Sequence, residues 1–212
     1  MGITKLSKSG FTSSSYEKYN DFLAGNAAFN PYSYESIATA TGNGTSGTIT
    51  FSSIPATYTH LQIRYMGQTA RPTYPDDALG MQFNSDTGSN YSYHTLRLDE
   101  TSTTVIAESG ANQTGTNSGY GSLGGSGGSS LYWGVGVIDI LDYANTNKYK
   151  TVRILAGGEN NTAISTVLGS VGLSSGLWQS TSAITSVSLF SAATGANFTT
   201  NTQFALYGIK GA

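Results

Sequence analysis

Two histidines, His60 and His94, are the residues of this chain best suited to act as a general base near neutral pH. Each lies in a run that alternates polar and apolar residues, which is typical of a strand and not of the surroundings of a nucleophile. The serines lie in Ser/Thr-rich turns, without a Gly-x-Ser-x-Gly elbow that is followed by a helix. A Ser-His-Asp arrangement assembled only in space would leave no signal in the sequence. We therefore predict no catalytic residue and no enzymatic activity.

Paired carboxylates are the other groups that could do chemistry. The pairs are Asp76 with Asp77, Asp99 with Glu100, and Asp139 with Asp142. A glycosidase needs two carboxyl groups that face each other across a cleft. Adjacent acids at the ends of strands are more typical of solvated turns, and we interpret all three pairs in that way.

The run Asp86-x-Gly88-x-Asn90 spaces oxygen ligands as some calcium loops do. It lacks the remainder of such a loop and its closing Glu, so a β-turn is the better interpretation. The chain has no Cys, which excludes thiolate metal sites and disulfides. The Gly-rich stretch contains no Lys and no following helix, so it is not a phosphate-binding loop. We predict no metal and no cofactor.

The composition limits the partners. Only 10% of the residues are charged and the net charge is −2, without a basic cluster, which argues against nucleic acid and against an anionic membrane surface. The N-terminus has no apolar core of signal-peptide length, and no segment approaches the ~18 apolar residues of a membrane span. We expect synthesis and folding in the cytoplasm.

Tyrosine is abundant on what should be a neutral surface. Tyrosines on loops provide large contact areas at low entropic cost and suit the binding of proteins or sugars. The candidates in or near loops are Tyr74, Tyr91, Tyr93, Tyr120 and Tyr143. The alternative for each of them is a half-buried position at the end of a strand.

The run from Gly47 to Met66 shows which elements position these side chains. Ile49 and Phe51 alternate with polar residues, and after Pro55 the same alternation returns with Leu61 and Ile63. A period of two places the apolar side chains on one face of a strand. Pro55 removes a ladder donor, so the chain should leave the sheet there and re-enter it near residue 60.

The same signature recurs from residue 34 to the end. It predicts strands near 34–40, 47–53, 60–68, 79–84, 92–98, 102–108, 131–141, 149–156, 163–170, 184–190 and 203–209. Many short strands separated by polar turns predict an all-β antiparallel sandwich, jelly-roll-like, over 34–212. An up-and-down barrel is the second choice. Trp133 and Trp178 are predicted core anchors, and Gly134 with Gly136 should face a closely packed element.

Two segments differ from this pattern. The Gly- and Ser-rich stretch at 110–130 has few apolar side chains and is predicted to be a long loop, either a tip that meets a partner or a tolerated insertion. Residues 1–33 are predicted to be an anchoring arm with a short helix after a capping box at 14–17. The arm should dock through an aromatic set, Tyr16, Tyr19, Phe22, Leu23, Phe29 and Tyr32. The alternative is a helix that packs on its own sandwich.

Five stretches, at 49–64, 84–94, 143–151, 175–186 and 197–209, share strand patterns and turn sequences such as Ile-Thr-Phe-Ser-Ser-Ile-Pro and Tyr-Ala-Asn-Thr-Asn-Lys-Tyr. Together they resemble a β-sandwich module that recurs in structural proteins of tailed bacteriophages, in head appendages and tails. The resemblance covers about residues 36–210 and transfers no active site. It implies a virion component that is displayed outside and commonly trimeric.

From this resemblance we expect an exterior capsid decoration or cement protein, a homotrimer whose partner is the major capsid protein or a tail protein of the same virion. The alternative is a tail fibre or receptor-binding appendage that binds host-surface carbohydrate through the tyrosine-bearing loops. A depolymerase is a third hypothesis, and we expect it to fail.

Overall fold

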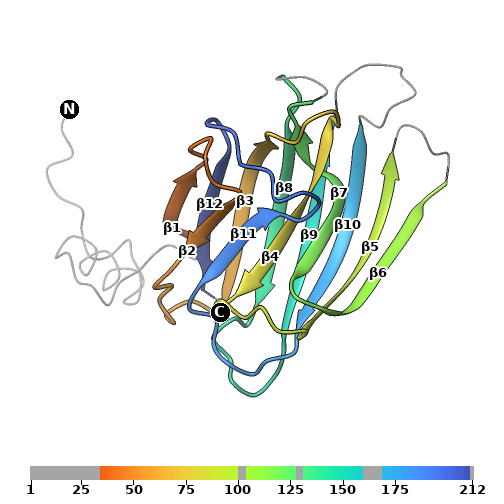
Figure 1. Ribbon diagram of the computed structural model, residues 1–212. Coiled ribbons are helices and arrows are strands. Elements are labelled where there is room, and N and C mark those ends of the chain that lie inside the picture. The colour runs from red at the N-terminus through yellow and green to blue at the C-terminus, as the bar shows by residue number, and fades with distance from the viewer. Residues whose placement is uncertain (1–33, 100–103, 128–130, 160–168, 211–212) are drawn as a thin grey trace, which may run out of the picture. The chain divides into compact units, whose positions relative to one another are not determined.

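The structure is a computed structural model that describes residues 34–99, 104–127, 131–159 and 169–210, and these ranges contain strands and no helix (Figure 1). No helix that is long and apolar enough to cross a membrane is found in them. The strands are β1 (Tyr34–Thr41), β2 (Thr48–Phe51), β3 (His60–Thr69), β4 (Asp76–Phe83), β5 (Tyr91–Asp99), β6 (Ile106–Gln113), β7 (Thr116–Gly125), β8 (Gly134–Leu141), β9 (Lys150–Gly158), β10 (Ser170–Trp178), β11 (Val187–Ser191) and β12 (Gln203–Ile209). The predicted all-β fold is confirmed.

The strands form two layers. The larger layer, sheet A, has the order β1-β12-β3-β8-β9-β10-β5-β6, and the smaller layer, sheet B, has the order β2-β11-β4-β7. A short parallel pairing of Gln68 and Thr69 in β3 with Gly124 and Gly125 in β7 joins them. All other pairings are antiparallel. Figure 1 shows sheet B in front of sheet A.

The chain winds as a jelly roll. The successive strands β1 and β2, β3 and β4, β7 and β8, and β11 and β12 lie in each case one in each sheet. Such repeated crossing from sheet to sheet defines the jelly roll. The strand pairs β5–β6 and β9–β10 are additions that extend sheet A beyond β8. Sheet A is therefore wider than sheet B, and the predicted jelly-roll-like sandwich is confirmed.

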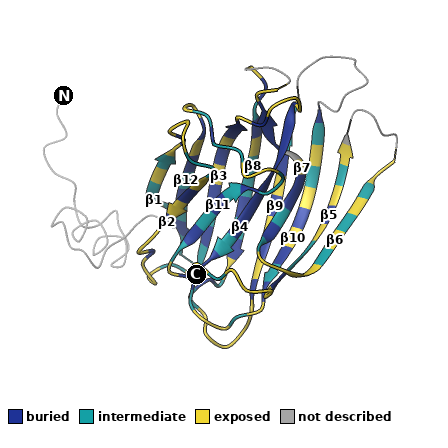
Figure 2. Cartoon of the chain, viewed as in Figure 1, coloured by how far each residue is buried: buried dark blue, intermediate teal, exposed yellow. Residues whose placement is uncertain are grey.

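The core lies between the sheets and follows the predicted alternation. Ile49, Phe51, Leu61 and Ile63 are at most 9% exposed. Figure 2 shows buried positions alternating with exposed ones along the strands. The chain breaks at Pro55 and resumes a strand at residue 60, as predicted, but it crosses from sheet B to sheet A and does not re-enter the same sheet. Each large apolar side chain removed from water in this way contributes about 1.5 to 3 kcal/mol to folding.

The prediction of a loop at 110–130 is wrong. Most of this stretch forms the end of β6 and all of β7, and β7 packs against β9, β10 and β5 of sheet A. The Gly and Ser residues permit close approach of the sheets. A Cβ on Gly124 would lie 2.4 Å from the Tyr132 carbonyl oxygen, and the Ser174 hydroxyl of β10 in sheet A donates to the Ser118 carbonyl of β7 at 3.1 Å. The low apolar content of β7 therefore reflects the close packing of the two sheets, and not the absence of a buried core.

Strand β10 was missed for the same reason. Its sequence, Ser-Val-Gly-Leu-Ser-Ser-Gly-Leu-Trp, is rich in Gly and Ser. A Cβ on Gly176 would lie 2.6 Å from a Thr116 methyl group in β7, and Ser174 bonds through its hydroxyl to Thr95 at 2.9 Å. The small side chains of β7 and β10 therefore face each other across the narrow part of the sandwich. The strand predicted at 163–170 falls largely on 160–168, outside the described residues.

The two glycines of β8 face closely packed elements, as predicted, but Trp133 is not the core anchor that was predicted. Gly134 faces the backbone of β7, with a built Cβ 2.5 Å from the Ser122 carbonyl oxygen, and Gly136 faces the Tyr65 ring. Trp178 is a core anchor, 3% exposed, beside the rings of Phe83 and Tyr91. Trp133 is only half-buried and lines a hollow on the outside of sheet A.

Candidate interaction surface

The outer face of sheet A carries a continuous apolar area that sheet B does not cover. Strand registers align Val137 with Leu155, Leu155 with Leu173, and Leu173 with Leu96, so these side chains form one row across β8, β9, β10 and β5. The adjacent row contains Met66, Val135, Val171 and Leu98. We call these eight residues the apolar face.

The side chains of the apolar face are unusually exposed. Leu155 is 57% exposed, Val171 56% and Leu96 53%, although each lies in a strand that is paired on both sides. Together the eight residues expose on the order of several hundred Å², which matches or exceeds the largest apolar patch of a typical monomeric protein. Patches of that size mark sites of interaction with proteins or ligands.

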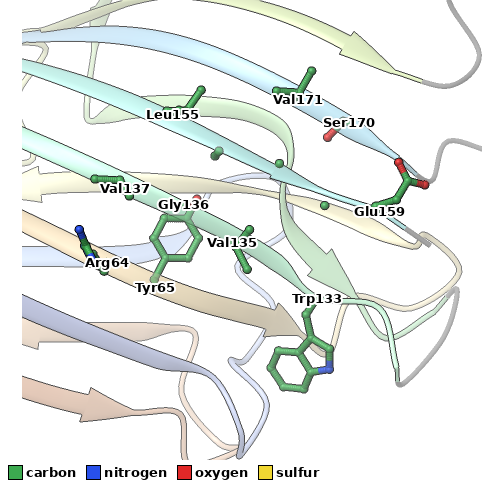
Figure 3. A pocket seen from close by; sticks show the side chains of 13 residues that line it. Arg64, Tyr65, Trp133, Val135, Gly136, Val137, Leu155, Glu159, Ser170 and Val171 are labelled. Carbon is green, nitrogen blue, oxygen red and sulfur yellow. The ribbon is translucent and has the colours of Figure 1, made fainter. Parts of the chain in front are cut away.

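A hollow of about 710 Å³ deepens one end of the apolar face. In its row Gly157 stands between Val135 and Val171, so one side chain is missing from the outer surface. Trp133 borders the hollow on one side, and Leu155 lines it on the other (Figure 3). Most of the wall is aromatic or aliphatic, as in sites that receive an apolar group, with Arg64, Glu159 and Ser170 also lining the hollow.

A polar row borders the apolar face. Gln62, Asp139 and Arg153 lie next to one another on the outer surface of β3, β8 and β9. The Gln62 amide donates to Asp139 at 2.8 Å, and Arg153 pairs with the other Asp139 oxygen at 3.1 Å. An apolar centre with a polar border of both charge signs is the usual composition of a protein interface.

The structure brings two of the five predicted tyrosines together. Tyr74 and Tyr120 are 55% and 40% exposed, and both rings lie on the guanidinium group of Arg71, with centroids 4.3 and 5.3 Å from its carbon. The loop that carries Tyr74 is held by backbone bonds from Gly125 to Pro75 and from residue 127 to Arg71. The two rings therefore form a fixed, exposed aromatic pair.

The other three tyrosines do not form a binding surface. Tyr91 is 1% exposed; its hydroxyl accepts from the Phe83 N–H at 2.9 Å, and burial raises its pKa to about 12. Tyr143 is fully buried and donates to the Pro55 carbonyl, and burial raises its pKa as well. Tyr93 is half-buried in β5. Tyr91 and Tyr143 were wrong as ligand candidates, because alternation in the strand and a turn after β8 direct them into the core.

The two histidines lie apart from each other, and only His60 contacts a carboxylate in the described residues, with its Nδ1 atom 3.4 Å from Asp142 Oδ1. The Nδ1 atom of His60 accepts from the Asp142 N–H at 3.0 Å, while His94 is exposed on the outer face of β5. The hydrogen bond from Lys148 lowers the pKa of Asp142. Among the described residues, no three His, Cys, Asp or Glu side chains gather as metal ligands would.

The pair Asp76 and Asp77 is buried and not solvated as expected. Asp77 accepts hydrogen bonds from the hydroxyls of Thr69 and Ser191, both at 2.7 Å, and so ties β3, β4 and β11 together. Burial raises the pKa of Asp76, an effect that the charge of Arg71 opposes. In the pair Asp99 and Glu100, the second residue lies outside the described ranges.

The turn at Asp86 agrees with its interpretation as a β-turn. Its carboxylate accepts hydrogen bonds from the Gly88 N–H at 2.8 Å, from the Asn90 amide at 3.0 Å and from the Trp178 indole at 2.7 Å. The bond from Trp178 is the main cause of its lowered pKa. The arm residues Tyr16, Tyr19, Phe22, Leu23, Phe29 and Tyr32 lie outside the described residues.

Sequence reasoning missed the apolar face, although a signal was present. Strand β8 reads Gly-Val-Gly-Val-Ile-Asp-Ile-Leu, apolar or small at nearly every position. Strands with apolar residues on both faces are typical of sheets that are covered on both sides. Val135 and Val137 face outward, whereas Gly134 and Gly136 face the core. The apolar side chains of residues 134–137 therefore lie on the outer surface of sheet A.

The fold and this surface define the class of protein: an all-β jelly-roll sandwich with an extended sheet whose outer face is apolar. Comparisons with protein-family models, with curated proteins and with solved structures found no match to this chain.

Proposed function

We propose that this protein is an exterior structural subunit of a bacteriophage virion, a capsid decoration or cement protein that assembles as a homotrimer through the apolar face. The observation that carries the proposal is the exposure of Leu155, Val171 and Leu96 in strands of sheet A that are paired on both sides. The resemblance of residues 36–210 to phage structural modules supports the virion location.

A second copy of this chain is the occupant that fits the apolar face. A standard interface buries about 800 Å² on each partner, so the apolar face and its polar border are of the right size for one such contact. The border contains both Asp139 and Arg153, so copies of this face can meet without an excess of either charge. In a cyclic trimer the contacts are heterologous, so different parts of the apolar face of each copy meet its two neighbours around the three-fold axis.

The stabilising role in the virion depends on repeated contacts between the trimer and the shell. Weak contacts between each subunit and the shell add up when a trimer presents three of them, because the second and third contacts form at high effective concentration. A protein that binds only the closed shell raises the temperature at which the shell opens. In this proposal the arm at 1–33 contacts the major capsid protein and the sandwich projects from it.

The oligomeric state of the full chain tests the self-association. Leu155→Asp places a charge in the middle of the apolar face without touching the core, and sedimentation equilibrium should change from trimer to monomer. Thr50→Asp is the matched control, since Thr50 is an exposed strand residue on the outer face of sheet B, and it should remain trimeric. A monomeric wild-type protein, or a trimeric Leu155→Asp variant, contradicts self-association through this face.

Heating virions tests the cement role. Particles that carry the protein should release DNA at a higher temperature than particles that lack it, and added protein should restore the difference. Equal opening temperatures would contradict the cement role, and a cryo-EM map of the particle would show where the chain lies.

A further inference from the structure

A second hollow lies on the opposite side of the sandwich, on the outer face of sheet B. It has a volume of about 370 Å³ and is lined by residues of β2, β4 and β11 and of the loops beside them. Its side chains include Thr48, Gln82, Ser188 and Phe190. None of the residues that line it is charged, although the size is in the range of small-ligand sites.

The hollow contains one aromatic ring, which the sheet holds in a defined place. Phe190 lies over Gly80 of the neighbouring strand β4, where a built Cβ would lie 2.4 Å from the ring. A Cβ built on Gly115 would also lie close to the ring, 3.1 Å from its Cζ atom. Two glycines thus make room for the ring, which remains half-buried and in contact with the hollow. An aromatic ring fixed in this way offers a rigid apolar surface at low entropic cost.

Neutral hydrogen-bonding groups surround the ring. The Gln82 amide donates to the Thr114 carbonyl at 2.7 Å, which fixes its orientation and leaves its Oε1 as an acceptor. The Ser188 hydroxyl bonds to that of Thr50 at 3.0 Å and keeps further bonding capacity. Thr48 is exposed at the edge. These groups suit a ligand with several hydroxyls and no charge.

We propose that this hollow is a binding site for a neutral saccharide, in which the C–H face of a pyranose ring stacks on Phe190 while Gln82 and Ser188 bond to its hydroxyls. The aromatic pair of Tyr74 and Tyr120 is a weaker candidate, because buried charged groups, Arg71 and Asp76, lie beneath it. The hollow faces away from the apolar face, so assembly through sheet A leaves it open to solvent.

Saturation-transfer NMR of the full chain with methyl glycosides of glucose, galactose, mannose and N-acetylglucosamine tests the site, together with an array of neutral oligosaccharides. At least one neutral sugar should bind. Phe190→Leu keeps an apolar side chain over Gly80 but removes the ring, and binding should weaken by roughly 2- to 13-fold, the loss expected for one aromatic contact. Phe190→Tyr should retain binding, and Gln82→Leu should weaken it.

The double variant Tyr74→Leu/Tyr120→Leu is the matched control, and its affinity should equal that of the wild type. Absence of any neutral-sugar binding overturns the proposal. So does a loss in the tyrosine double variant with Phe190→Leu unaffected. The site is complete within one chain, so Leu155→Asp should still bind sugar. Sugar binding by a monomeric wild type would refute self-association and leave this site supported.

Discussion

Lys150 provides the sharpest test of how the described core is held together. Its side chain is fully buried at the start of β9. The ammonium group donates to three backbone carbonyls, those of Asn145 at 2.5 Å, Lys148 at 3.0 Å and Thr181 at 3.2 Å. Lys150 thereby links the turn after β8 to the loop after β10. Lys150→Met keeps an unbranched side chain, one atom shorter, and removes all three donors.

The substitution should lower the free energy of unfolding by about 2 to 4 kcal/mol, because each carbonyl left buried without a donor costs about 1 to 3 kcal/mol and the loss of a buried charge offsets part of that. In a chain of this size the melting temperature should fall by roughly 5 to 15 °C. Lys148→Met is the control. The Lys148 side chain is 53% exposed and pairs with Asp142, so its loss should change stability by less than about 1 kcal/mol.

The pH dependence gives an independent check in urea unfolding. Burial, and secondarily the charge of Lys148, lowers the pKa of Lys150 in the folded protein. The unfolded chain keeps this proton to higher pH, so wild-type stability gains from Lys150 as pH rises from the lowered pKa toward about 10.4. The difference between wild type and Lys150→Met should widen over that interval. Equal stability of Lys150→Met and Lys148→Met would refute the argument.

Two further predictions concern the core. The pKa of Tyr91 is raised to about 12 in the folded protein, so the unfolded chain loses this proton at lower pH than the folded chain does. Wild-type stability should therefore fall between about pH 10 and 12, by roughly 2 to 3 kcal/mol from this group. Tyr91→Phe should show a smaller fall in stability between about pH 9 and pH 11.5 in urea titrations, and equal falls in the two proteins would contradict the prediction. Gly134→Ala should destabilise the protein by more than about 2 kcal/mol, because the new Cβ meets the backbone of β7 at 2.5 Å. Gly172→Ala, whose Cβ has its nearest neighbour at 3.5 Å, should be nearly neutral, and similar losses in both variants would disprove the difference in packing.

The sequence by itself determined the class of fold and, for the most regularly alternating strands, which face is buried. Alternation is a local property, so Ile49, Phe51, Leu61 and Ile63 could be assigned to one buried face without knowing what covers it. Pro55 and the polar turns marked where the chain leaves the sheets, because their backbone preferences act within a few residues.

For strands without a clear alternation of apolar and polar residues, only the tertiary structure decided which face packs against the other sheet. Strands β7 and β10 have too few apolar residues to be recognised locally, and they are stable because their glycines and serines fit against each other across the two sheets. The eight residues of the apolar face come from five strands, and only the register aligns them into one surface. Phe190 and Gln82 likewise meet only because β11 pairs with β4. Contacts between residues distant in sequence depend on strand order, which no local pattern encodes.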